Sequence, residues 1–221
     1  PASGPPGGSA AVSARGKFIT VEGIEGTGKS TNVAFLASLV EAQGFEVVKT
    51  REPGGTPMAE KIRQLLLEHD QERVPDTAEL LMFFAARSLH LENLIIPALD
   101  RGQWVLCDRF TDASRAYQGD GRGLDMQQID TLANWVQHGL EPDLTVLLDA
   151  PAEIGMQRAK TRGEGDRMDN EALAFYQRVR AGYLALAKRD PQRFVVIDAR
   201  RPLDDVRAQI ESEMTQFFSK K

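Results

Sequence analysis

The amino-acid sequence predicts an α/β fold in which helices flank a five-stranded parallel sheet. Three observations lead to this prediction. Short runs rich in β-branched and aromatic residues alternate along the chain with segments of helical periodicity. Most of these runs are continuously apolar, as is typical of parallel strands covered on both faces. The first run also leads straight into a glycine-rich loop.

The predicted strands cover residues 17–22, 45–50, 104–108, 144–149 and 194–198. A helix is expected over 31–43, directly after the glycine-rich loop, and another around 80–94. Three further segments repeat apolar residues at helical spacing: Met58, Ile62, Leu65 and Leu66; Met126, Ile129, Leu132 and Val136; and Leu203, Val206, Ile210, Met214 and Phe217. Strands that alternate with helices imply βαβ units, right-handed crossovers and one parallel sheet.

Length and composition limit the class of protein. The 221 residues suffice for one α/β domain, which we expect over residues 16–221. Residues 1–15 are mostly Pro, Gly, Ser and Ala, so we expect a disordered extension there, either native or an expression remnant. A net charge of −5 argues against a protein that coats nucleic acid, and no apolar stretch is long enough for a membrane helix. The single cysteine, Cys107, favours a reducing compartment, the cytoplasm.

The strongest local signal is the segment 23–30, GIEGTGKS, which fits the phosphate-binding pattern G-x-x-x-x-G-K-[ST]. Glycines let the backbone point its N–H groups inward, and the following helix adds the partial positive charge of its N-terminus. Lys29 supplies a cation to the β- and γ-phosphates of a nucleotide, and the Ser30 hydroxyl is a ligand for Mg²⁺. A chance match by a glycine-rich turn is the alternative, but the strand before the loop and the helix after it argue against this. The loop indicates a nucleoside triphosphate and leaves the reaction open.

A second phosphate site is indicated at the end of the strand 104–108. Asp108 is expected beside the glycine-rich loop, where it can hold the water shell of the metal ion. Arg109 would then face the gap between a donor and an acceptor phosphate, where a guanidinium binds oxygen atoms in pairs. The alternative is an ordinary ion pair at the strand end, because such pairs are common.

The helix around 80–94 offers a third element. Phe83 and Arg87 are four residues apart and therefore share a face of this helix. An aromatic ring followed one turn later by a guanidinium can stack on a planar base and bind its phosphate. The alternative is that Phe83 is a core residue, but a charge on the same face calls for an anionic or watery neighbour.

The polar segment 152–171 contains two glycines and several basic residues, among them Arg162 and Arg167. It is either a solvated face or a lid that brings arginines over the transferring phosphates. A kinase needs such a lid to exclude water, which would otherwise hydrolyse ATP.

Together these segments resemble the bacterial thymidylate kinase family. The match runs in order along almost the whole chain from residue 17 onward: GIEGTGKST at 23–31, TREPGGT at 50–56, FFAAR at 83–87, DRFTDASRAYQGDGRG at 108–123 and TRGEGDR at 161–167. TREPGGT and the DR…AYQG block are specific, because adenylate, guanylate and shikimate kinases do not combine them. The resemblance implies the P-loop nucleoside-monophosphate-kinase fold and transfer of the γ-phosphoryl group of ATP to dTMP, with Mg²⁺ as cofactor, giving dTDP and ADP. It also implies a homodimer formed by helix packing.

The resemblance further implies roles for single residues. Phe83 would stack on thymine, and Arg87 would bind the phosphate of dTMP or the edge of its base. Ser114 would hydrogen-bond the base, and Tyr117 would lie against the deoxyribose. Arg109 would contact the acceptor phosphate, and Glu25 would lie near the 3′-hydroxyl. The expected substrate residues are Glu25, Arg51, Pro53, Phe83, Arg87, Arg109, Ser114, Tyr117 and Gln118; the ATP-binding residues are Gly23, Ile24, Glu25, Gly26, Thr27, Gly28, Lys29, Ser30 and Thr31; the catalytic residues are Lys29, Arg109, Arg162, Arg167 and Glu25; and the metal ligands are Ser30 and Asp108.

One position distinguishes subtypes of the family. Some members carry an arginine inside the loop where this chain has Gly26, so here Arg162 or Arg167 is expected to neutralise the charge of the transition state. Ala113 and Leu89 replace a frequent serine and a frequent glutamine, so the contacts to the base are expected to differ in detail.

Two other functions compete with this prediction. The nearest is a kinase for another pyrimidine monophosphate, dUMP or UMP, since only the resemblance selects thymine. The other is a nucleotide-binding switch of the GTPase kind. Such proteins read guanine through an N-K-x-D motif, which this sequence lacks.

Overall fold

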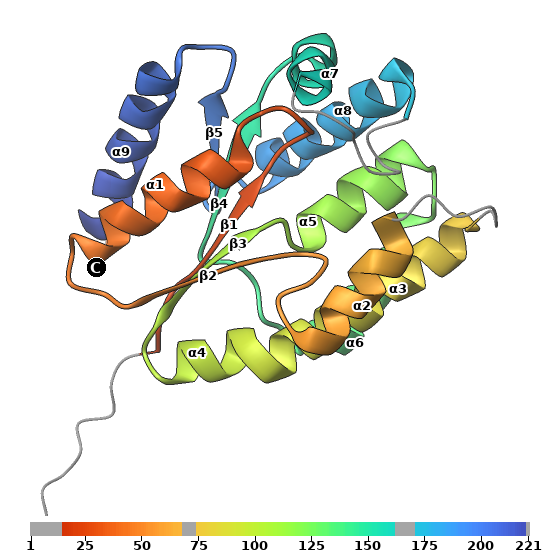
Figure 1. The fold of residues 1–221 in the computed structure, drawn as a ribbon, viewed down its shortest axis with the longest axis horizontal. Coiled ribbons are helices and arrows are strands. Elements are labelled where there is room, and N and C mark those ends of the chain that lie inside the picture. Colours follow the sequence, from red (N-terminus) through yellow and green to blue (C-terminus); the bar gives the residue numbers. More distant parts are fainter. Residues whose placement is uncertain (1–14, 68–73, 162–170, 220–221) are drawn as a thin grey trace, which may run out of the picture.

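The strands predicted from the sequence form one sheet in which all neighbours run parallel. The computed structural model describes residues 15–67, 74–161 and 171–219, and the statements below concern these ranges. The strands are β1 (Phe18–Glu22), β2 (Val47–Arg51), β3 (Trp104–Asp108), β4 (Leu144–Asp149) and β5 (Phe194–Asp198), in the order β2-β3-β1-β4-β5 (Figure 1). The predicted five-stranded parallel sheet is therefore confirmed. Only the bounds of β1 and β2 differ, by one or two residues.

Helices connect the strands and cover the sheet. They are α1 (Lys29–Glu41), α2 (Pro57–Leu67), α3 (Asp76–His90), α4 (Ile96–Asp100), α5 (Thr111–Ser114), α6 (Met126–Gln137), α7 (Ala152–Lys160), α8 (Leu173–Arg189) and α9 (Leu203–Ser219). Two π-helical stretches, η1 (Leu91–Ile95) and η2 (Arg115–Gly121), continue α3 and α5. The helix after the glycine-rich loop begins at Lys29, two residues earlier than predicted, so the lysine of the loop already lies in its first turn.

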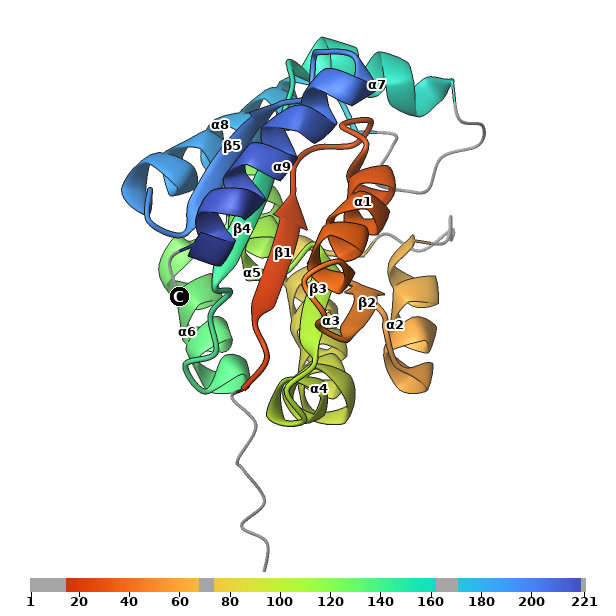
Figure 2. The same cartoon turned by 90° about the vertical axis from the view of Figure 1, so that its left-hand side faces the viewer.

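The sheet is covered on both faces (Figure 2). On one face, Ile19 and Val21 of β1 join a core cluster with α1 and α9. On the other face, Phe18 packs against η1 and α4, and α8 packs beside them on β4. Because side chains alternate along a strand, Thr20 and Glu22 point to the same face as Phe18. Both are fully buried. The carboxyl group of Glu22 thus enters the interior at the end of β1.

The carboxyl ends of β1 and β3 lie side by side near the centre of the sheet. After β1 the chain crosses to β2, which lies at one edge of the sheet. After β3 it crosses to β4, which lies on the other side of β1. Ligands of open parallel sheets bind outside the strand ends at such a point. The backbone of Arg109, just after β3, still donates to the Val21 carbonyl at 3.0 Å. The segments that follow β1 and β3 therefore start next to each other.

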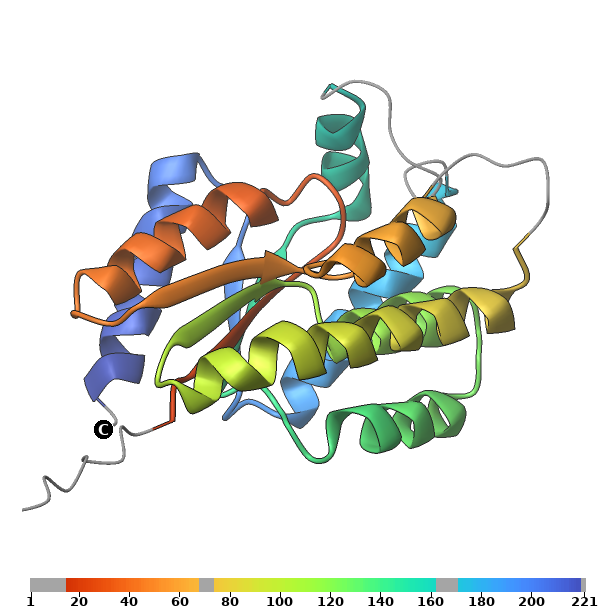
Figure 3. The same ribbon diagram turned by 60° about the horizontal axis from the view of Figure 1, so that its bottom comes forward.

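Helices α2, α3 and α6 lie next to one another (Figure 3), and each exposes an apolar side chain. The apolar stripe predicted in α2 is only partly buried: Leu66 is inside, whereas Leu65 is 64% exposed. Leu81 of α3 is also exposed, and Trp135 of α6 is 74% exposed. These helices present an apolar surface that the described part of the chain does not cover.

Residues Asp76–Asp100 form one helical run of 25 residues. Its length and mean hydropathy of 1.2 would by themselves allow it to cross a membrane. However, Glu79, Arg87 and His90 of this run are buried and hydrogen-bonded to side chains elsewhere in the fold. Buried polar groups with such partners are typical of a helix packed inside a globular protein.

Candidate functional site

The glycine-rich loop links β1 directly to α1. Thr27 Oγ1 and Lys29 Nζ both donate to the Ile24 carbonyl, each at 2.8 Å. Gly28 is the N-cap of α1 with a φ of +85°, and no acidic residue lies in the first turn of the helix. The first N–H groups of α1 and its partial positive charge therefore point into the loop, which makes the loop a site for anions.

Gly26 lies against α7 with backbone meeting backbone. A Cβ atom at Gly26 would come within 2.0 Å of the Gly155 carbonyl oxygen, and its φ of +75° also disfavours a side chain. Reciprocally, a Cβ atom on Gly155 would lie 2.5 Å from the Glu25 carbonyl oxygen. An arginine at position 26 would thus require α7 to move away from the loop.

Lys29 is half-buried near several charges. Burial, followed by the nearby charge of Arg109, lowers the pKa of Lys29 to about 8, while Asp108, Glu25 and Glu22 act in the opposite direction. An anion bound in the loop would favour the charged form of this lysine.

Arg109 lies between the loop and α5. Its Nη1 donates to the Gly23 carbonyl at 3.0 Å, and its Nη2 donates to Glu25 at 2.6 Å and to the Tyr117 hydroxyl at 3.0 Å. The guanidinium carbon also lies 4.7 Å from the centre of the Tyr117 ring. Burial opposes the ionised form of Glu25, but the charges of Arg109 and Lys29 outweigh it and lower the pKa of that carboxyl.

Arg87 of α3 is almost fully buried in a network of partners. Its Nε donates to Glu52 at 2.7 Å, Nη1 and Nη2 both donate to Ser114 Oγ at 3.1 Å, and Nη2 also donates to the Phe110 carbonyl at 3.2 Å. Burial opposes the ionised form of Glu52, but Arg87 and a hydrogen bond with His90 lower its pKa. Because a guanidinium has five N–H groups, these four bonds leave one N–H of Nη1 without a partner among the described residues.

A pocket opens beside the loop, between α3, α5 and the segment after β2. It brings together eight of the expected substrate residues: Glu25, Pro53, Phe83, Arg87, Arg109, Ser114, Tyr117 and Gln118. Arg51 is not among its lining residues. The Arg51 guanidinium pairs with Glu60 through bonds of 3.1 and 2.9 Å and lines a neighbouring groove. Its role as a substrate residue stays a prediction.

The pocket also contains residues that we did not select from the sequence. They are Glu52, Arg63, Leu67 and Phe110; Ala113, which the sequence indicated only as a departure on the base side, lines the pocket as well. Arg63 lies beside the apolar stripe of α2 and donates to the Pro53 carbonyl at 2.9 Å. An arginine next to an apolar stripe could have indicated from the sequence that Arg63 is a site residue. The position of Glu52 depends on Arg87, 35 residues away, and no local pattern indicates that pairing.

Ser30 and Asp108, the expected metal ligands, lie together. Ser30 Oγ is 3.3 Å from Asp108 Oδ2, and Asp108 Oδ1 is buried with no hydrogen-bond partner among the described residues. A carboxylate oxygen without a partner, beside a hydroxyl, suits a hard cation that prefers oxygen ligands. No group of three or more His, Cys, Asp or Glu side chains in the described ranges encloses a metal position. This donor set fits Mg²⁺, which binds few protein ligands and keeps phosphates and water in its shell.

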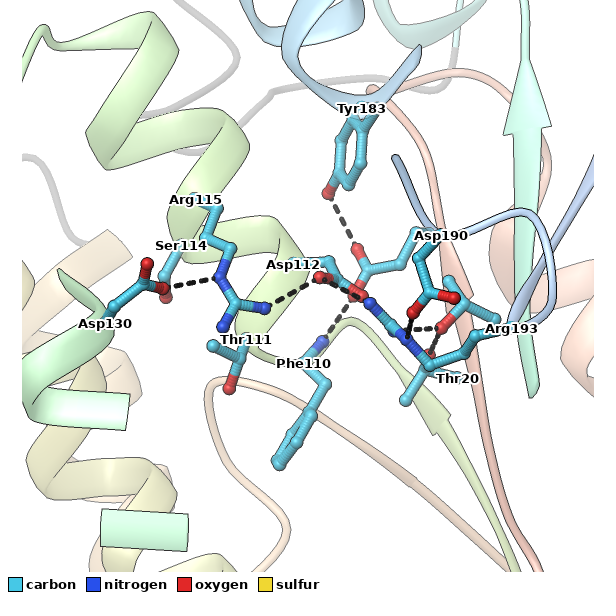
Figure 4. A network of polar contacts seen from close by, with 12 residues as sticks. Thr20, Phe110, Thr111, Asp112, Ser114, Arg115, Asp130, Tyr183, Asp190 and Arg193 are labelled. Atoms are coloured by element: carbon cyan, nitrogen blue, oxygen red, sulfur yellow. Dashed lines mark hydrogen bonds and ion pairs between the residues drawn. The ribbon is translucent and has the colours of Figure 1, made fainter. Parts of the chain in front are cut away.

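A chain of ion pairs lies beneath the segment that follows Arg109 (Figure 4). It runs from Asp130 through Arg115, Asp112 and Arg193 to Asp190, with distances of 2.8, 3.1, 2.6 and 2.9 Å. These ion pairs join α6, the start of η2, α5 and the segment before β5. It therefore fixes the part of the protein that carries one wall of the pocket.

Two expected catalytic residues, Arg162 and Arg167, lie outside the described residues, as do residues 1–14 of the expected extension. The described start of the expected lid is α7. Its Arg158 donates to the carbonyls of Ala199 and Arg200 at 2.7 and 3.2 Å, so it is tied to the segment after β5. The lid stays a prediction.

The chain is similar to proteins of one family. The family model described as "Thymidylate kinase" matches residues 21–210. The thymidylate kinase of Chromohalobacter salexigens is 58% identical over 203 residues, covering 91% of this chain and 96% of that protein. The thymidylate kinase of Methylococcus capsulatus is 56% identical over 204 residues, covering 92% and 97%. A crystal structure of thymidylate kinase from Ehrlichia chaffeensis matches with a TM-score of 0.73 and 36% identity, covering 90% of this chain and 99% of that chain.

Proposed function

The chain belongs to the thymidylate kinase family and transfers the γ-phosphoryl group of ATP to dTMP, and we propose that it does so where the loop 23–31 meets the pocket of Phe83. One observation carries this proposal. Arg109 contacts Gly23 of the loop and Tyr117 of the pocket with the same guanidinium. ATP would occupy the loop and dTMP the pocket, so that their phosphates meet at Arg109.

The loop would supply the donor site. Backbone N–H groups and the N-terminus of α1 suit the β- and γ-phosphates. Lys29 Nζ donates to the Ile24 carbonyl, which leaves two of its three N–H groups for phosphate oxygens. The charge of Lys29 would then be neutralised by the nucleotide.

The cofactor of this proposal is Mg²⁺, held by Ser30 and Asp108. The Ser30 hydroxyl would be a direct ligand, and the carboxylate of Asp108, whose Oδ1 has no hydrogen-bond partner among the described residues, would hold ligand water. When bound, the ion neutralises charge that develops on the phosphates. The backbone of α1 and the end of β3 keep both side chains in place.

The pocket would bind dTMP with the base toward α3. Phe83 offers an aromatic face for stacking. Arg87 has one N–H without a partner in the described part of the chain, which suits a single acceptor such as a carbonyl oxygen on the edge of the base, rather than the paired oxygens of a phosphate. Arg109, which lies closer to the loop, would then bind the phosphate of dTMP. Of the two roles that the resemblance leaves open for Arg87, we therefore propose the contact with the base.

The transfer itself needs no strong general base. A phosphate oxygen of dTMP is already an anion at neutral pH, so the protein has to position the two nucleotides and neutralise their charge. Glu25 holds Arg109 at 2.6 Å and accepts from the Tyr117 hydroxyl at 2.6 Å, which orients the guanidinium before dTMP arrives. We further propose Arg162 and Arg167 as cations that join the site when ATP is bound.

We propose that the protein forms a homodimer through α2, α3 and α6. Each of these neighbouring helices exposes a large apolar side chain, namely Leu65, Leu81 and Trp135. Exposed large apolar side chains on neighbouring helices are typical of a contact site between proteins. A second copy of the chain offers the same surface, as a two-fold dimer requires.

We propose the cytoplasm as the place of the reaction, because ATP and dTMP are both available there. The free thiol of Cys107 is buried, which is compatible with a reducing compartment.

The variant Phe83→Ala tests the assignment of the pocket. Loss of a stacking ring should raise the KM for dTMP about tenfold, while the KM for ATP should change by less than about twofold. Phe45→Ala is a matched control, because Phe45 stacks on Trp104 with ring centres 4.8 Å apart and is absent from the lining of the pocket. This control should lower the melting temperature without changing the KM for dTMP. An unchanged KM for dTMP in Phe83→Ala would argue against the assignment.

A further inference from the structure

Arg109 has an unusual backbone conformation. Its φ is +71°, in the left-handed region. Among the described residues the only other non-glycine residue there is His138, at the C-terminal cap of α6, where such a conformation is common. A non-glycine residue in the middle of a site keeps this strained conformation only where its surroundings hold it.

Glu22 holds the peptide that follows Arg109. The Phe110 N–H donates to Glu22 Oε1 at 2.7 Å. Glu22 is the last residue of β1 and is fully buried, so its carboxylate is fixed by the central strand of the sheet. The turn at Arg109 is therefore tied to the strand that leads into the phosphate-binding loop.

Tyr183 of α8 connects the same carboxylate to the guanidinium. Its hydroxyl donates to Glu22 Oε2 at 2.7 Å and accepts from Arg109 Nη1 at 3.3 Å. The two donors, Tyr183 and Phe110, are labelled in Figure 4, and they contact different oxygens of the Glu22 carboxyl group. Glu22 thus acts on Arg109 in two ways. It bonds the peptide N–H that follows Arg109, and through Tyr183 it is linked to the Arg109 guanidinium.

We propose that Glu22, acting with Tyr183, is a positioning residue that holds the Arg109 guanidinium at the junction of the two phosphate sites. Burial, followed by the nearby charge of Asp112, raises the pKa of Glu22 to about 8, so the site disfavours the ionised form of this carboxyl group. An apolar side chain would avoid this electrostatic cost but would leave the Phe110 N–H and the Tyr183 hydroxyl without this partner. The carboxyl group gives the Phe110 N–H and the Tyr183 hydroxyl a shared partner.

Steady-state kinetics of three variants test this proposal. Glu22→Leu keeps a similar volume but removes both polar contacts, and it should lower kcat/KM for dTMP by roughly tenfold or more. Glu22→Gln keeps an acceptor for Phe110 and a polar partner for Tyr183, and it should stay within about threefold of the wild type. Tyr183→Phe removes the hydroxyl that links Glu22 to the guanidinium but keeps the bond between Glu22 and the Phe110 N–H, so it should lie between these two. The KM for ATP should change by less than about threefold in all of them.

Thr20→Val is the matched control. Thr20 lies on the same strand and the same face as Glu22 and is equally buried, but its hydroxyl bonds Thr145 at 3.0 Å. Its kinetics should equal those of the wild type. A loss in Thr20→Val as large as that in Glu22→Leu would overturn the proposal, as would a Glu22→Gln variant no better than Glu22→Leu.

The Arg109→Ala background shows whether Glu22 acts through Arg109. In that background Glu22→Leu should lower kcat/KM for dTMP by less than about a further twofold, because the guanidinium that Glu22 positions is gone. A loss as large as in the wild-type background would overturn the proposal. If circular dichroism shows that Glu22→Leu does not fold, Tyr183→Phe in both backgrounds takes its place, and additive losses would again overturn the proposal.

The inference rests on the proposed role of Arg109, and the same experiment separates the two. An Arg109→Ala variant with wild-type activity toward dTMP would contradict the proposed role of Arg109. A strong loss in Arg109→Ala, combined with an additive loss from Glu22→Leu, would contradict only the positioning role of Glu22.

Discussion

The positively charged side chains of the site differ in the groups that they contact. Arg109 is paired with Glu25, and Arg87 is paired with Glu52. Lys29 instead contacts the carbonyl oxygen of Ile24. A half-buried cation that contacts a neutral oxygen gains most from a bound anion. Among these residues, Lys29 should therefore respond most strongly to the binding of ATP.

The pKa of Lys29 predicts how ATP binding changes with pH. With a pKa of about 8 in the free protein, lowered by burial and by Arg109, Lys29 is mostly charged at pH 7 and mostly neutral at pH 9. If the charged form binds the triphosphate, the dissociation constant of a non-hydrolysable ATP analogue should rise about tenfold between pH 7 and pH 9. Calorimetric titration across this range measures the effect. Lys29→Met should bind weakly with little pH dependence, and a flat profile in the wild type would contradict the prediction.

At the scale of elements, the contact of the loop with α7 explains why the loop lacks an arginine. Gly26 and Gly155 bring the two backbones too close for a side chain on either residue. The loop of this chain is therefore packed against the helix that starts the expected lid. Any additional cation for the phosphates has to come from elsewhere, and Arg162 and Arg167 remain the proposed source.

Gly155→Ala tests the importance of this contact. The new methyl group would lie 2.5 Å from the Glu25 carbonyl oxygen, so α7 or the loop must shift. We expect the KM for ATP to rise roughly five- to tenfold, with a change in the KM for dTMP of less than about twofold. Gln157→Ala on the exposed side of α7 is the control and should have wild-type kinetics. An unchanged KM for ATP in Gly155→Ala would show that the close packing has no role in the donor site.

At the scale of the whole molecule, the exposed apolar surface of α2, α3 and α6 predicts how the dimer can be broken. Leu65→Glu combined with Trp135→Glu places charges on two of these helices and should convert the dimer to a monomer. Sedimentation velocity measures the change. Leu203→Glu, at an exposed apolar residue of α9, is the control and should leave the dimer intact. A wild-type protein that sediments as a monomer would contradict the proposal.

Much of the fold could be predicted from the sequence because its signals are local. The runs that became β3, β4 and β5 have the predicted bounds, and the glycine-rich loop identified its neighbouring strand and helix. The features missed depend on contacts between distant segments. The left-handed turn at Arg109 is bonded to Glu22, 88 residues from Phe110 in the chain, and through Glu22 to Tyr183 of α8. No periodicity or motif spacing encodes such a contact, so only the folded chain reveals it.

The central claim is that the loop of Lys29 transfers a phosphoryl group from ATP to dTMP bound in the neighbouring pocket. Initial rates of ADP formation with dTMP, dUMP, UMP and AMP, for the wild type and Lys29→Ala, test it most directly. We predict the highest kcat/KM for dTMP and a loss of about a hundredfold or more in Lys29→Ala. A preference for UMP or AMP over dTMP, or a Lys29→Ala variant that keeps most of its activity, would contradict the claim.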